Sequence, residues 1–91
     1  MQEQFKKWLI RKGYKEYTPS GNPSTVYTYV KCIDKVCKIE NLSWDALAKN
    51  IDYIVPLYDK NGEKANIGKQ SHNSVISALK QFQEFVKDTQ K

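Results

Sequence analysis

The segment STVYTYVKCIDKVCKI, Ser24 to Ile39, carries an apolar stripe and a basic face at helical spacing. Its apolar residues recur at i, i+3, i+4, i+7, i+10 and i+11, which is the period of a helix that buries one side in a core. They are Val26, Tyr29, Val30, Ile33, Val36 and Cys37. On the opposite side the spacing places Tyr27, Lys31, Lys35 and Lys38. Because Ser24 has the residue type of an N-cap, we predict a helix over residues 25–39 with a lysine ridge facing away from the core.

Three further segments have the same period. Residues 2–12 form the first, with Gly13 as its stop, and the second lies within residues 41–52 behind the N-cap residue Ser43. The third and most regular covers residues 71–87. Their apolar positions are Phe5, Trp8 and Leu9; then Trp44, Leu47 and Ala48; and finally Val75, Ala78, Leu79, Phe82, Phe85 and Val86.

Residues 52–58 fit a short helix less well, because Pro56 removes an internal hydrogen bond unless it lies in the first turn. Tyr53 and Tyr58 flank this apolar segment, and we expect both to be half-buried. The Asn-Gly pair at 61–62 predicts a polar turn. Since no strand pattern or internal repeat competes, the sequence predicts a compact all-α bundle of four to five short helices in one domain, residues 1–91.

Length and composition predict a small globular protein. With 91 residues, 40% of them hydrophobic and 27% charged, the chain suffices for one modest core. No apolar run reaches the roughly 18–20 residues of a membrane span, and no signal peptide is recognisable, which predicts a cytoplasmic protein with no membrane partner. Cys32 and Cys37 are five positions apart on one helix, so they are expected to be free thiols near the core.

The excess of positive charge lies in the first part of the chain. Residues 1–38 contain eight basic and three acidic residues, a net charge of +5, whereas residues 39–91 contain seven of each and are neutral. This asymmetry favours a polyanionic partner for the first two helices.

Groups that would support catalysis are scarce. His72 is the one histidine, the carboxylates stand singly, and no phosphate-binding glycine motif is present. The cysteines lack the spacing of a metal site. We therefore expect no catalytic activity, metal, cofactor or small-molecule substrate for this chain.

The candidate binding residues fall into two groups. Lys31, Lys35 and Lys38 form a ridge at i, i+4, i+7 that suits phosphates, with Thr25 and Tyr27 on the same helix. Polar residues opening the last helix form the second group: Lys69, His72 and Asn73. Two other interpretations remain open, namely that the polar residues cap the helix and that the lysines form a solvated surface.

These motifs together resemble the N-terminal SAM-like domain of phage integrases, the core-binding domain of tyrosine recombinases. The resemblance rests on Phe5, Trp8 and Leu9 in the first helix, Thr25 and Tyr29 in the second, and Leu79, Phe82 and Phe85 in the last. It implies a helical bundle that clamps duplex DNA during site-specific recombination and DNA integration. By the same resemblance the catalytic residues belong to a separate domain that this chain lacks.

The resemblance therefore implies double-stranded DNA as the partner, beside a C-terminal catalytic domain or a partner protein. The alternative is a protein–protein interaction module that docks to or inhibits a DNA-processing enzyme. In that case the basic face would meet an acidic surface, and exposed Trp8, Tyr14 or Tyr17 would be anchors.

Overall fold

Six helices and no strand are present in the part of the chain that the computed structural model describes, residues 1–15, 17, 19–21, 24–59, 61–68 and 70–89. The side chains at 68 and 70–74 are outside this description. The helices are α1 (Gln2–Arg11), α2 (Thr25–Glu40), α3 (Trp44–Lys49), α4 (Ile51–Tyr58), α5 (Ala65–Gly68) and α6 (Gln70–Thr89). The all-α prediction is confirmed, with α5 as an additional short helix.

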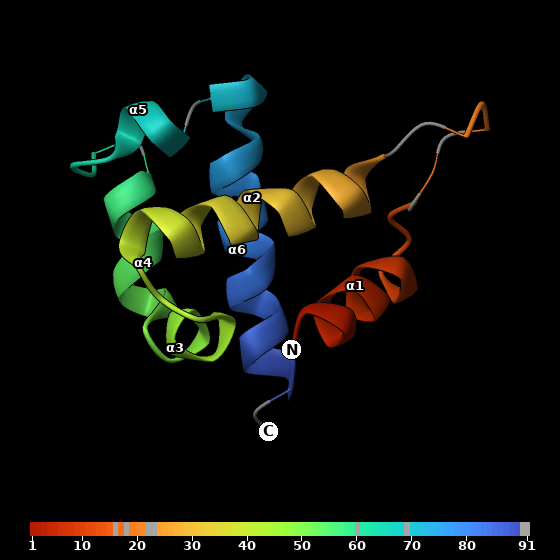
Figure 1. Ribbon diagram of the computed structural model, residues 1–91, viewed down its shortest axis with the longest axis horizontal. Coiled ribbons are helices and arrows are strands. Elements are labelled where there is room, and N and C mark those ends of the chain that lie inside the picture. The colour runs from red at the N-terminus through yellow and green to blue at the C-terminus, as the bar shows by residue number, and fades with distance from the viewer. Residues whose placement is uncertain (16, 18, 22–23, 60, 69, 90–91) are drawn as a thin grey trace.

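Helix α6 is the central element of the bundle. Helix α2 crosses it and makes the most extensive contact, α1 packs against both, and α3 and α4 cover the other side (Figure 1). Helix α5 lies next to the amino-terminal end of α6. Among the described residues, no helix is both long and apolar enough to cross a membrane.

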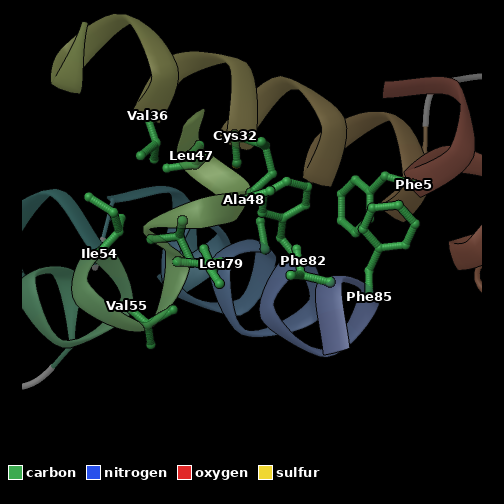
Figure 2. Close-up of a cluster of buried hydrophobic side chains, with 14 of the residues drawn as sticks. Phe5, Cys32, Val36, Leu47, Ala48, Ile54, Val55, Leu79, Phe82 and Phe85 are labelled. Carbon is green, nitrogen blue, oxygen red and sulfur yellow. The ribbon is translucent and has the colours of Figure 1, made fainter. Parts of the chain in front are cut away.

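The core is rich in aromatic rings. Phe5 lies with its ring centroid 5.2 Å from that of Phe82 and 5.3 Å from that of Phe85, and Trp44 meets Phe82 edge-on at 5.6 Å. Figure 2 shows Phe5, Phe82 and Phe85 gathered in the space between the helices. Such tilted and edge-to-face pairs contribute about 0.5–1.5 kcal/mol each beyond the burial of their area. The predicted core positions of α1 and α6 are all buried, as expected.

Helix α4 forms in spite of Pro56, which lies in its second turn. The ring is exposed, and the helix continues past it because the Asp59 amide donates to the Val55 carbonyl at 3.1 Å. The apolar residues Ile51, Ile54, Val55 and Tyr58 all face the core. Tyr53 lies outside this stripe and is 80% exposed, so the prediction that it is half-buried was wrong. Tyr58, at 1% exposure, is more deeply buried than expected.

The chain turns back over the end of α4 at Gly62. Its amide donates to the Asp59 carbonyl at 2.8 Å, and the Lys64 amide donates to the Leu57 carbonyl at 2.7 Å. The turn therefore satisfies carbonyls that the end of a helix leaves unpaired. A Cβ at Gly62 would lie 2.1 Å from the Pro56 carbonyl oxygen and 2.2 Å from that of Leu57. The position therefore requires glycine because of close approach between backbone segments.

The predicted N-cap residues differ in whether their side chains make a capping hydrogen bond. Ser43 precedes α3, and its Oγ accepts a hydrogen bond from the Ala46 amide at 3.1 Å, which confirms the prediction. Ser24 occupies the N-cap position of α2, but its side chain makes no capping hydrogen bond among the described residues. Gly13 follows α1 with φ of 104°, as expected for a residue that ends a helix.

Cys32 and Cys37 are buried free thiols, as predicted. Burial, assisted by the nearby Asp34 carboxylate, raises the pKa of Cys37 from 9.0 to about 11. Burial also raises the pKa of Cys32, and that of Tyr58 above its usual 10.0.

These shifts predict a loss of stability at high pH. The folded protein keeps the Cys37 proton at a pH where the unfolded chain releases it, so the contribution is complete below pH 9.0 and lost as pH rises towards about 11. Urea unfolding at a series of pH values should therefore show a falling free energy of unfolding over this window. In Cys37→Ala the fall should be smaller, and an unfolding free energy that stays constant across the window in the unmodified chain would contradict the prediction.

Candidate nucleic-acid interface

The basic ridge, defined as Lys31, Lys35 and Lys38, lies on the solvent side of α2. Val26, Ile33 and Val36 bury the other side of the helix at 0% exposure. All three lysines are exposed, and Tyr27 is exposed to 42% at the start of the same face. The predicted separation of an apolar stripe from a basic face is therefore confirmed.

Tyr27 and Lys31 contact each other within this face. The Lys31 Nζ lies 5.1 Å from the centroid of the Tyr27 ring, which is a cation–π distance. At an exposed site such a contact is worth about 0.5–1 kcal/mol. It therefore holds the first lysine of the ridge over α2 while its ammonium group remains exposed.

The acidic residue Asp34 borders the ridge on α2. The Asp34 Oδ2 lies 3.5 Å from the Lys38 Nζ, and Asp34 is also three positions from Lys31 on the same helix. Both side chains of the ion pair are largely exposed, at 79% for Lys38 and 47% for Asp34, so the pair contributes little to stability. Its main effect is to lower the positive potential at this end of the ridge.

At the amino-terminal end of α2 a main-chain amide is already hydrogen-bonded within the protein. The Val26 amide donates to the Lys15 carbonyl at 3.2 Å, so this amide is not available to a phosphate. Thr25, predicted to contact DNA, is half-buried. The same hydrogen bond brings the main chain at the exposed residue Lys15 to the first turn of α2.

Helix α1 contributes to the same surface through Lys6. A shallow groove between α1 and α2 is lined by Gln2, Glu3, Lys6, Val26, Tyr27 and Val30. Lys6 and Lys15 were not among the predicted binding residues, although both belong to the basic first part of the chain. The charge asymmetry of residues 1–38 indicated only that this part of the chain is basic. The packing of α1 and of the residues after it against α2 places Lys6 and Lys15 near the start of α2.

The second predicted group stays a prediction. Lys69 lies outside the described residues. His72 and Asn73 belong to the first turns of α6, but their side chains are outside the description.

The titratable groups with the largest pKa shifts lie in the core. The Tyr58 hydroxyl donates to the Glu40 carboxylate at 3.0 Å, and the Lys64 Nζ donates to the same carboxylate. Burial is the main cause of the raised pKa of Tyr58, and the hydrogen bond to Glu40 is the second. The two hydrogen bonds to Glu40 join the end of α2 to α4 and to the turn before α5. Within the described residues, no group of three or more His, Cys, Asp and Glu side chains could hold a metal ion.

The aromatic anchors proposed for a protein partner are mostly not exposed. Trp8 is only 5% exposed, because α1 packs it against Phe85 at a centroid distance of 5.8 Å, so its prediction as an exposed anchor was wrong. Tyr14 is half-buried with its ring 5.7 Å from that of Tyr29. Tyr17 is exposed, at 55%.

Comparison with known proteins gives no family from which a function could be assigned. No protein-family model, no curated protein and no solved structure matches the chain.

Proposed function

We propose that the chain is a duplex-DNA-binding module that follows a phosphate backbone with the basic ridge of α2. The observation that supports the proposal is the exposure of all three ridge lysines on the face opposite the core. From Lys31 to Lys38 the helix rises about 10 Å. The ridge is therefore long enough to lie along adjacent phosphates of one strand.

Lys6 and Lys15 extend this surface beyond α2. Lys6 lines the groove that also contains Tyr27, and the Lys15 main chain lies against the first turn of α2. The contacts would be to phosphates, which favours binding with little sequence preference. The resemblance to the core-binding domain of tyrosine recombinases supports the same partner, and within it the module would hold DNA for a separate catalytic domain.

Fluorescence anisotropy with a labelled duplex across a salt series tests the proposal. Three to five neutralised phosphates predict that log K falls linearly with log salt concentration, with a slope of about −3 to −4.5. A single strand of equal length should bind more weakly, because its phosphates are not held at the duplex spacing. Absence of duplex binding at low salt, or a slope near zero, would overturn the proposal.

Removing the acidic residue beside the ridge should strengthen binding. In Asp34→Asn a negative charge 3.5 Å from the Lys38 Nζ is lost, and duplex affinity should rise by about two- to fivefold at ~0.1 M salt. Anisotropy titration of both proteins measures the change. Glu63→Gln is the matched control, since it removes one exposed negative charge from the turn after α4. An equal gain in both variants would show that net charge, and not the position of Asp34, determines affinity.

A further inference from the structure

A second surface feature lies on the side of α1 that faces the carboxyl-terminal end of α6. It is an open groove of about 590 Å³ lined by Gln4, Lys7, Ile10, Arg11, Phe85 and Thr89. A smaller hollow of about 330 Å³ adjoins it, because Arg11 and Thr89 line both. We call the larger hollow the α1–α6 groove.

The groove has an apolar floor. Ile10 is 44% exposed, although α1 buries its own apolar stripe at Phe5, Trp8 and Leu9. Phe85, which lies almost wholly in the core at 3% exposure, provides the α6 side of the floor. An exposed aliphatic residue beside an apolar hollow with polar borders is typical of an interaction site.

The α1 border of the groove is basic, whereas Asp88 of α6 lines the adjoining hollow beside Arg11. Lys7 and Arg11 are exposed, lie one helical turn apart, and have no ion-pair partner among the described residues. Like charges at this spacing destabilise a helix by about 0.2–0.5 kcal/mol, although Arg11 in the last turn of α1 is favoured by the helix dipole. An acidic partner would complement the pair.

The walls of the groove are held in place by contacts between α1 and α6. The Trp8 Nε1 donates to the Asp88 carboxylate at 3.0 Å, and the Lys12 Nζ lies 2.9 Å from the Glu84 carboxylate and 5.0 Å from the Trp8 ring centroid. The Thr89 hydroxyl donates to the Phe85 carbonyl at 2.9 Å. A ligand would therefore meet a preformed surface and would not have to order the groove.

We propose that the α1–α6 groove binds an acidic amphipathic helix of a partner protein. The helix would place apolar residues at i, i+3 or i+4, and i+7 over Ile10 and Phe85, and carboxylates beside Lys7 and Arg11. Duplex DNA has no apolar ridge to fill the floor. A second copy of the chain is a poor complement because each copy carries a net charge of +5. The inference is independent of DNA binding, since Lys6 faces α2 whereas Lys7 and Arg11 face α6.

The test uses the ¹⁵N-labelled full chain and a synthetic acidic helical peptide with leucines at these spacings. Amide shifts should change at Lys7, Ile10, Phe85 and Thr89. A peptide of the same composition with its leucines distributed around the helix should bind at least about fivefold more weakly. Lys7→Glu/Arg11→Glu should weaken binding by about tenfold. Lys31→Glu/Lys35→Glu, an equal change in charge on α2, should alter it by less than about twofold.

The apolar floor has its own pair of variants. Ile10→Ser should weaken peptide binding by about fivefold, whereas Ile39→Ser, which changes another exposed isoleucine (39% exposed), should have no effect. The proposal is overturned if no shift change occurs at about 1 mM peptide, or if both peptides bind equally. It is also overturned if sedimentation shows a dimer of the unmodified chain that Lys7→Glu/Arg11→Glu dissociates, since the occupant would then be a second copy. A chain that binds the peptide but not DNA would refute only the DNA proposal.

Discussion

Lys31→Glu/Lys35→Glu is expected to lower duplex affinity by about 100-fold or more at ~0.1 M salt. Each substitution removes one phosphate contact and places a negative charge beside the DNA backbone, so each costs more than simple loss of the lysine. The slope of log K against log salt concentration should fall by about two, one for each contact. Both side chains are exposed on α2, so the helical content should not change.

Anisotropy and circular dichroism of the same samples measure these effects. Lys49→Glu/Lys87→Glu is the matched control, because it changes two exposed lysines on α3 and α6 and gives the same net charge. The control should lose only a few-fold in affinity through the weaker overall field. If both double variants lost the same affinity, the basic ridge would not be the contact surface.

Gly62→Ala is expected to destabilise the fold by about 3 kcal/mol or more. The new Cβ would lie 2.1 Å from the Pro56 carbonyl oxygen and 2.2 Å from that of Leu57, which are backbone atoms of α4. Since a side-chain rotation cannot relieve this overlap, either the turn or the end of α4 must move, and overpacking of this kind costs about 1–3 kcal/mol or more. The hydrogen bond between the Lys64 amide and the Leu57 carbonyl would be lost with it.

Thermal unfolding should show the effect as a decrease in Tm of roughly 12–24 °C for a domain of this size. Gly21→Ala is the matched control: it has φ of 86° but no neighbour within 4 Å of an added Cβ. Only the left-handed backbone opposes that substitution, at a cost of about 1–2 kcal/mol. Equal losses in the two variants would mean that the close approach at Gly62 is not what requires glycine.

The sequence predicted those parts of the fold that depend on local period. The stripes of α2 and α6 are long enough for the period to decide both the helix and its buried side. Helix α4 is too short for this, because eight residues with an internal proline give two turns of signal. Its burial pattern, and with it the exposure of Tyr53, follows from how α4 packs against α6. The turn at Gly62 was predicted from its residue types, but the reason for glycine lies in a neighbouring helix.

The candidate interface, like the fold, was predicted from the sequence only where it depends on the period of one helix. The basic ridge follows from the period of one helix, whereas Lys6 and Lys15 join it only because α1 and the following loop contact the start of α2. The α1–α6 groove depends on residues more than seventy positions apart in the chain, so no local pattern indicates it. Trp8 is a different case, because the sequence already placed it in an apolar stripe. That position argued against its prediction as an exposed anchor.

The hydrogen bond between Trp8 and Asp88 joins residues 80 positions apart, and it has a consequence during synthesis. Helix α1 leaves the ribosome first among these elements, with its apolar residues Phe5, Trp8 and Leu9 uncovered. The rings that pack against Phe5 and Trp8 belong to α6, the last of these helices to be translated. Until then the nascent chain presents an amphipathic segment that a chaperone can bind, and the bundle closes only when α6 is complete.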